Sequence, residues 1–192
     1  MSSSVCVFCG SSPGSNPAFL TAAEEVGRWL GGHGHALVYG GANRGLMKAL
    51  ADSALAAGGR VIGVLPEKLL DLEIAHRGLT ELRVVADMHE RKATMASLAD
   101  AFLALPGGMG TLEELAEAFV WTQLGYHRKP CGVLDIDGYY QPFLELLDHM
   151  VESRFLKAEQ RAQWVVGTDP GETLERLLAS RPQPMEKWLD TP

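Results

Sequence analysis

Short apolar segments alternate with amphipathic segments along almost the whole chain, and this alternation constrains the fold more than any other feature. The apolar segments have the length of strands and are bounded by glycine, proline or charged residues, as buried strands are. They cover residues 5–8, 36–39, 60–65, 82–85, 101–105 and 132–135, with 164–166 as a weaker candidate. The helical patterns between them cover residues 17–30, 46–57, 88–98, 112–124, 140–153 and 171–180.

This order predicts an α/β fold: a Rossmann-like, doubly wound parallel sheet of about seven strands with helices on both faces. We expect one nucleotide-binding domain over residues 1–180, followed by an extended tail over 181–192 in which Trp188 is a possible anchor. In such sheets, ligands bind beyond the carboxyl ends of the strands, so the unusual residues are expected there.

Charge and composition exclude several classes of partner. The chain has 17 Lys and Arg residues against 24 Asp and Glu residues, a net charge of −7, which disfavours nucleic acids and anionic membranes as partners. No apolar run is long enough to span a membrane. The first four residues carry no positive charge and no long apolar stretch follows, so we expect a cytoplasmic protein.

The cysteines do not form an evident metal site. Cys6 and Cys9 have C-x-x-C spacing but lie at a predicted strand, and Cys131 is distant in the sequence. Zinc would lack a closed ligand set. Buried or loop thiols in a reducing compartment are the favoured interpretation, and no metal is expected.

The first strand is followed by a loop of small residues, 9–16. It contains the letters G-x-S-x-G, but a nucleophile elbow would need Ser12 on a sharp strand-to-helix turn, and the next helix starts only after Asn16. A polar binding loop or a plain turn is favoured over the elbow. Gly10, Ser11 and Ser12 are the candidate ligand-binding residues of this loop.

The second strand is also followed by glycines, in residues 39–47. Gly40, Ala42 and Gly45 loosely imitate the dinucleotide-binding fingerprint, but they follow the second strand rather than the first. No acidic residue ends the next strand, which argues against NAD. A mononucleotide contact and a tight turn both remain open.

The fifth strand leads into the most glycine-rich segment, residues 105–114. Free amides at the start of the following helix, together with its positive dipole end, would form an anion site. The alternative is a helix start with a capping box, because Thr111 and Glu114 have the S/T-x-x-E spacing. A capping box does not account for the sequence Pro-Gly-Gly-Met-Gly over residues 106–110.

Arg91 lies on the apolar side of the helix expected after Asp87, its N-cap. It follows Met88 by three residues and precedes Met95 by four, so the three side chains share a face. Arg91 is either a rim arginine or a guanidinium directed into a cleft toward a carboxylate or phosphate. Lys92 lies off that face and by default is solvated.

Two motifs carry a resemblance to a known family. Residues 106–114 have the form P-G-G-x-G-T-x-x-E, and the sequence Met-His-Glu-Arg-Lys over residues 88–92 precedes them by a helix and a strand. Together they resemble the LOG ("Lonely Guy") family of cytokinin-activating nucleoside 5′-monophosphate phosphoribohydrolases, some of which were long labelled lysine decarboxylases. The resemblance covers nearly the whole chain, including residues 9–12, 38–41 and 123–130.

The resemblance implies a dimeric Rossmann-like enzyme that hydrolyses the N-glycosidic bond of AMP or N6-substituted AMP. The products are a free base and ribose 5-phosphate. The family's catalytic residues fall on Arg91 and Glu114. The substrate-binding residues, from the loops and the resemblance together, are Gly10, Ser11, Ser12, Gly40, Gly41, Glu73, Lys92, Pro106, Gly107, Gly108, Gly110 and Thr111.

The chemistry of these residue types agrees with the implied reaction. Breaking a ribosyl C–N bond builds positive charge on the sugar, which a carboxylate can stabilise while it orients hydroxyls or activates water. Glu114 lies one helical turn, about 5 Å, past the expected phosphate amides, and Glu113 points about 100° away. Arg91 would hold Glu114 in place or contact the nucleotide. No cofactor is required.

Two other functions compete with this one. A non-catalytic nucleotide-binding or carrier protein would need the phosphate loops but not the Arg91–Glu114 pair. A pyridoxal-phosphate lysine decarboxylase would need an active-site lysine, and only Lys92 lies near a motif. A dimer interface is expected near Phe119, Trp121 and Tyr126, with plain core as the alternative.

Overall fold

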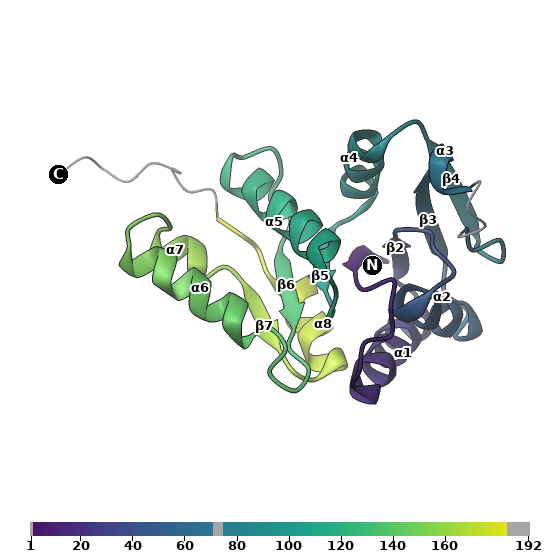
Figure 1. Ribbon diagram of the computed structural model, residues 1–192, viewed down its shortest axis with the longest axis horizontal. Coiled ribbons are helices and arrows are strands. Elements are labelled where there is room, and N and C mark those ends of the chain that lie inside the picture. The colour runs from purple at the N-terminus through teal and green to yellow at the C-terminus, as the bar shows by residue number, and fades with distance from the viewer. Residues whose placement is uncertain (1, 71–74, 184–192) are drawn as a thin grey trace.

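The structure, a computed structural model, describes residues 2–70 and 75–183 and contains one seven-stranded, all-parallel sheet. Its order is β4-β3-β2-β1-β5-β6-β7, the doubly wound arrangement predicted from the sequence (Figure 1). The strands are β1 (Ser4–Phe8), β2 (Ala36–Tyr39), β3 (Val61–Pro66), β4 (Glu81–Val85), β5 (Ala101–Ala104), β6 (Cys131–Leu134) and β7 (Val165–Gly167). Each lies within one residue of its predicted bounds.

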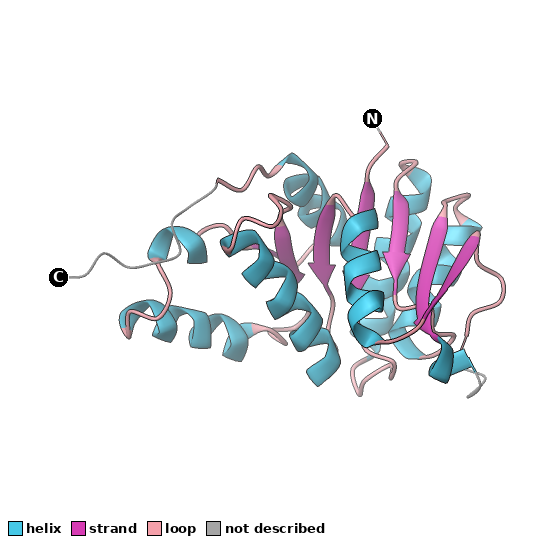
Figure 2. Cartoon of the chain, turned by 90° about the horizontal axis from the view of Figure 1, so that it is seen from above, coloured by secondary structure: helices cyan, strands magenta, loops and turns pink. Residues whose placement is uncertain are grey.

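The helices lie on both faces of this sheet (Figure 2). They are α1 (Pro17–Gly32), α2 (Gly45–Ala56), α3 (Glu67–Leu70), α4 (Met88–Leu98), α5 (Met109–Gln123), α6 (Gln141–Glu152), α7 (Ala158–Arg161) and α8 (Pro170–Ala179). Side chains from α1, α2 and α8 form the core on one face, and those from α4, α5 and α6 form the core on the other. The short helices α3 and α7 were not predicted.

Local sequence explains how α1 starts and how closely it packs. The Asn16 side chain accepts a hydrogen bond from the Ala18 amide at 3.0 Å, and Pro17 occupies the first helical position. A Cβ on Gly27 would lie 2.2 Å from the Leu50 carbonyl oxygen of α2. The close contact between α1 and α2 therefore requires glycine at this position.

Two predictions about burial are wrong. The strand at residues 82–85 was predicted to be buried, but β4 is an edge strand paired only with β3 among the described strands, and Val84 is 45% exposed. Met88 was placed on the inward face of its helix, but it is also 45% exposed, whereas Met95 is buried. Met88 is the first residue of α4, at the end of the helix that lies next to the exposed strand β4.

The strand order reverses at β1, which lies between β2 and β5. The connections that leave β1 and β5 pass to opposite faces of the sheet, to α1 and α5. This reversal opens a crevice beyond the carboxyl ends of the two strands, where doubly wound sheets bind ligands.

Two further sequence expectations concern the membrane and the tail. Within the described residues, no helix combines the length and the apolar character that a membrane crossing requires. The tail predicted over 181–192, with Trp188, lies outside the described residues from residue 184 onward.

Candidate active site

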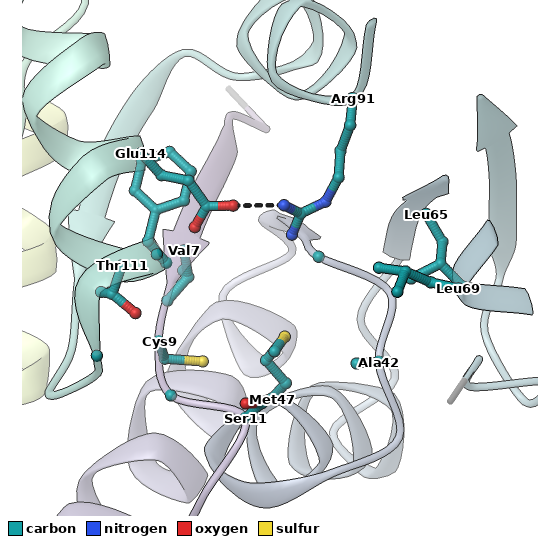
Figure 3. Close-up of a pocket in the computed structure, with 15 residues that line it drawn as sticks. Val7, Cys9, Ser11, Ala42, Met47, Leu65, Leu69, Arg91, Thr111 and Glu114 are labelled. Carbon is teal, nitrogen blue, oxygen red and sulfur yellow. Dashed lines mark hydrogen bonds and ion pairs between the residues drawn. The ribbon is translucent and has the colours of Figure 1, made fainter. Parts of the chain in front are cut away.

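A cavity of about 360 Å³ lies in this crevice, and we call it the main pocket. Its lining comes from the ends of β1 and β3, from the loops that follow β1, β2 and β5, and from α2, α3, α4 and α5. The lining residues are Val7, Phe8, Cys9, Gly10, Ser11, Gly40, Ala42, Met47, Leu65, Leu69, Arg91, Gly108, Gly110, Thr111 and Glu114 (Figure 3). The side chains of Arg91 and Glu114 point toward each other across it.

The loop after β1 packs directly on residues 106–110, which we call the phosphate loop. The Gly10 amide donates to the Pro106 carbonyl oxygen at 3.1 Å. A Cβ on Gly107 would lie 2.1 Å from the Thr111 hydroxyl oxygen and 2.9 Å from the Gly10 nitrogen. Glycine at 107 therefore lets the two loops meet, which a plain turn would not require.

The helix after the phosphate loop starts earlier than predicted. It begins at Met109 with Gly108 as its N-cap, so Thr111 is the third helical residue and forms no capping box with Glu114. Instead Thr111 is buried against Gly107. Since Gly108 has no side chain to cap the helix, the first amides of α5 remain available to an anion at its positive end.

Arg91 is buried and lines the main pocket, so it is the guanidinium directed into a cleft rather than the rim arginine. Its side chain is 10% exposed; Nε donates to the Val64 carbonyl oxygen at 3.2 Å and Nη1 donates to Glu114 Oε1 at 2.6 Å. A Cβ on Gly40 would lie 2.3 Å from Arg91 Nη2. The glycine after β2 therefore makes room for the guanidinium.

Glu114 shares this environment. Its side chain is 10% exposed. Burial raises the pKa of Glu114, and the Arg91 guanidinium opposes that rise. The carboxylate thus lies in a poorly solvated pocket beside one fixed positive charge, where its interactions with a developing cation are strong.

Lys92 lies elsewhere, although it was predicted to bind substrate. Its ammonium pairs with Glu113 and, at 3.1 Å, with Glu117, and it does not line the main pocket. Burial alone would lower the pKa of Lys92, but the two carboxylates raise it. Lys92 thus ties α4 to α5 on the outer side of the buried pair.

The glycines after β2 divide between a tight turn and the lining of the main pocket. Gly45 has a φ of +53°, and a Cβ there would lie 2.4 Å from the Ser11 carbonyl carbon, so this turn is tight. Gly40 lines the main pocket. Gly41 lies behind it with a φ of +75°, and its carbonyl accepts from the His76 amide at 2.9 Å.

The remaining predicted residues divide among a second cavity and the undescribed part of the chain. Ser12, Pro106 and Gly107 line a smaller cavity of about 230 Å³, the side pocket, which adjoins the main pocket at Gly10, Ser11 and Gly108. Glu73 lies outside the described residues. Ser12 follows β1 by four residues and precedes α1 by five, so it does not form a nucleophile elbow.

Sequence reasoning missed the apolar wall of the main pocket and one tyrosine. Met47, Leu65 and Leu69 form that wall: the two leucines lie on the side of the pocket away from Thr111, and Met47 lies between them and Cys9 (Figure 3). Tyr139 lines the side pocket. The signals were weak: Leu65 ends a predicted strand, and Tyr139 follows Asp137-Gly138, a turn at a strand end.

Metal and thiol chemistry have little support in the part of the chain that the structure describes. Residues 2–70 and 75–183 contain no cluster of three His, Cys, Asp or Glu side chains that could hold a metal ion. The three cysteines are free and buried, and burial raises the pKa of Cys131 to about 12. These thiols are protonated at neutral pH.

Comparison with known proteins identifies close relatives. A family model described as "Possible lysine decarboxylase" matches residues 47–177. A cytokinin riboside 5′-monophosphate phosphoribohydrolase from Rhodococcoides fascians is 48% identical over 167 residues, 86% of this chain and 84% of the relative. LOG5, with the same activity in its name, from Arabidopsis thaliana, is 46% identical over 178 residues, 93% of this chain and 78% of the relative.

Solved structures share the fold at lower identity. The molybdenum cofactor binding protein from Rippkaea orientalis has a TM-score of 0.70 at 23% identity, covering 93% of this chain and 96% of that one. At that identity the likeness concerns the fold alone. The family match and the two relatives confirm the resemblance carried by the Arg91 and Glu114 motifs, and the chain belongs to the family of cytokinin riboside 5′-monophosphate phosphoribohydrolases.

Proposed function

We propose that this chain hydrolyses the N-glycosidic bond of AMP or an N6-substituted AMP and releases the free base and ribose 5-phosphate. The observation that carries the proposal is the buried Arg91–Glu114 pair, which faces the main pocket one helical turn beyond the uncapped start of α5. The chain's membership of the phosphoribohydrolase family supports the same reaction.

The phosphate is held at the start of α5 in this proposal. The amides of Met109, Gly110 and Thr111 have no partner within the helix, and their combined dipole favours a dianion. Gly10 and Ser11 provide the facing wall. A small, glycine-lined site of this kind suits a monophosphate, which needs close approach of the backbone.

The carboxylate acts at the sugar in this proposal. As the bond between the base nitrogen and C1′ breaks, positive charge grows on the ribose, and Glu114 stabilises it and orients the water whose oxygen joins C1′. Arg91 keeps Glu114 oriented through the 2.6 Å hydrogen bond. The apolar wall of Met47, Leu65 and Leu69 is suited to the flat face of a base.

The alternative functions fit these residues less well. A carrier could use the phosphate loop, but it would not need a buried carboxylate with a raised pKa beside the ligand. A Schiff-base lysine must lose its proton, whereas Lys92 is held charged by Glu113 and Glu117 outside the pocket. Lys92 is therefore unsuited to the Schiff-base chemistry that a lysine decarboxylase would need.

Direct assay of the products tests the proposal. The purified protein is incubated with AMP, isopentenyladenosine monophosphate and adenosine, and free base and ribose 5-phosphate are followed by chromatography. We expect base release from at least one monophosphate and much slower release from adenosine, which lacks the phosphate. Saturable binding of both nucleotides without release would instead favour the carrier.

We also infer a cytoplasmic homodimer in which residues 1–180 act as one nucleotide-binding unit. Of the three residues predicted near the interface, Phe119 is buried in the core, whereas Trp121 and the 77% exposed Tyr126 line a groove of about 520 Å³ between α4 and α5. This groove is the face proposed for the second copy. Light scattering should give a dimer mass, and Tyr126→Glu should lower that mass.

A further inference from the structure

The connection between β6 and α6, residues 135–140, contacts the backbone around the phosphate loop at two carbonyl groups. The Tyr139 hydroxyl donates a hydrogen bond to the Gly107 carbonyl oxygen, and the Tyr140 hydroxyl donates to the Leu105 carbonyl oxygen at 2.6 Å. Two consecutive tyrosines therefore hold carbonyl groups two residues apart. The proposed hydrolysis assigned no role to this connection.

The connection is itself fixed by hydrogen bonds and by an unusual backbone. Asp135, which is buried, accepts hydrogen bonds from the Tyr140 amide at 2.6 Å and from Gln141 Nε2 at 2.9 Å. Asp137 and Gly138 both have positive φ, 51° and 75°, which turns the chain sharply before Tyr139. The backbone that carries Tyr139 is thus held by hydrogen bonds and a turn within the connection itself.

The two tyrosines differ in their surroundings. Tyr140 is fully packed in the core, with 1% of its surface exposed. Tyr139 is 40% exposed, lines the side pocket, and packs its ring edge against Phe19 of α1 at 5.4 Å between centroids. The Tyr140 contact stabilises the fold, whereas the Tyr139 contact lies at the rim of the site.

We propose that Tyr139 is a positioning residue for the phosphate of the substrate, acting through the Gly107–Gly108 peptide. A trans peptide group is planar, so its N–H points opposite to its carbonyl. When the Tyr139 hydroxyl fixes the Gly107 carbonyl, it also fixes the direction of the Gly108 amide, at the N-cap of α5. Glycine at both positions leaves this peptide free to rotate without such a contact.

The ligand class follows from the group that is positioned. An oriented backbone amide at the start of a helix binds an oxyanion. We take this oxyanion to be the 5′-phosphate of the substrate, and in this respect the inference rests on the proposed function. Tyr139 should therefore influence ligands that carry the phosphate, namely AMP and ribose 5-phosphate. It should not influence the free base, which binds against the opposite wall.

The variant Tyr139→Phe removes only the hydroxyl and tests this inference. We expect the KM for AMP and the dissociation constant of ribose 5-phosphate, measured by calorimetry, each to rise about 3- to 10-fold, the effect of one hydrogen bond. The kcat should change by less than about twofold, because Tyr139 does not touch the reacting atoms. The inhibition constant of adenine should stay as in the wild type.

Ser2→Ala is the matched control, since it removes an exposed hydroxyl that donates to a glycine carbonyl oxygen, that of Gly34 at 2.7 Å, outside both pockets. Unchanged binding of ribose 5-phosphate by Tyr139→Phe would overturn the inference, and so would an equal weakening of adenine. A wild-type protein that binds ribose 5-phosphate but releases no base would refute the proposed hydrolysis alone. The binding comparison would then still decide the role of Tyr139.

Discussion

Two ion-pair groups join the same two helices, α4 and α5, and they differ in what surrounds them. The inner pair, Arg91 and Glu114, faces the main pocket, and each side chain is 10% exposed. The outer group starts one residue later on α4: Lys92, whose side chain is only 12% exposed, pairs with the carboxylates of Glu113, which is 53% exposed, and Glu117, which is 29% exposed. Adjacent residues on a helix point about 100° apart, so the two groups separate into pocket and surface.

The difference shows which pair the fold needs and which the chemistry needs. A surface pair contributes about 0–1 kcal/mol and joins two helices that already pack together. A buried pair loses so much hydration that apolar residues of similar volume often serve stability as well or better. The buried pair lies in the main pocket beside the glycine-rich start of α5, so its retention is consistent with the role at a ligand that we propose for it.

Removing the inner carboxylate should have the largest effect. Glu114→Gln keeps the size of the side chain and an oxygen that can accept from Arg91, but it removes the negative charge to which our proposal assigns the stabilisation of the ribosyl cation. We expect base release from AMP to fall at least about 100-fold. Glu113→Gln, one residue away on the outer side, should retain most activity, and similar losses in the two variants would contradict the comparison.

Moving the inner arginine without deleting it should have the next largest effect. A methyl group at residue 40 would lie 2.3 Å from Arg91 Nη2 and 3.2 Å from Met47 Sδ, both at the ends of flexible side chains. Gly40→Ala should therefore displace the guanidinium while the fold persists, and we expect kcat/KM to fall about 10- to 100-fold, as for a misplaced catalytic group.

Gly32→Ala is the matched control for Gly40→Ala. Gly32 ends α1, and a Cβ there meets nothing within 4 Å. The control should keep wild-type kcat/KM and melting temperature. If Gly40→Ala were also fully active, Arg91 would not need its present position, and the inner pair would resemble the outer group in function.

The sequence predicted the fold and the inner pair because both leave local patterns. Continuous apolar runs identified all seven strands, since strands buried on both faces need such runs. Arg91 stood out because it shares a face with Met95, which is buried in the structure. The phosphate loop stood out because residues 106–110 hold more glycine than a turn needs, and Gly107 is in fact required for the contact with Thr111.

The parts that the sequence did not predict depend on contacts between distant segments. The capping box at Thr111 failed because the helix starts three residues earlier, with Gly108 as its N-cap, and the Thr111 hydroxyl packs against Gly107. Tyr139 contacts Gly107 from 32 residues away, and no local pattern marks such a pair. Lys92 was assigned to the substrate through the family resemblance, whereas the helical pattern had already placed it off the inner face, and in the structure it pairs with Glu113 and does not line the main pocket.

The pH dependence of activity should separate the inner carboxylate from ordinary ones. Burial raises the pKa of Glu114, so the ionised form that the proposed reaction requires is lost at a higher pH than for a solvated glutamate, whose pKa is about 4.3. The kcat should fall about tenfold per pH unit below that raised pKa. An acid limb at or below the ordinary glutamate value would contradict the role of burial.

Stability should respond to pH with a defined sign. A carboxyl group whose pKa is raised on folding favours the folded state below its unfolded pKa, and this contribution is lost as the pH rises through the folded value. The wild type should therefore lose stability relative to Glu114→Gln as the pH rises from below about 4 toward neutral. Chemical denaturation of both proteins across this range measures the difference, and a constant difference would contradict the raised pKa.

Removing the outer cation should have the smallest effect. Lys92→Met keeps the apolar stem that packs between α4 and α5 but leaves Glu113 and Glu117 to the solvent that already reaches them. We expect the free energy of unfolding to fall by no more than about 1 kcal/mol and kcat/KM for AMP to stay within about twofold. A tenfold rise in KM with unchanged kcat would instead mean that Lys92 leaves its carboxylates to contact the nucleotide, as the sequence motif suggested. In that case the two groups would be one continuous binding site, and the division between pocket and surface would hold only for the unliganded protein.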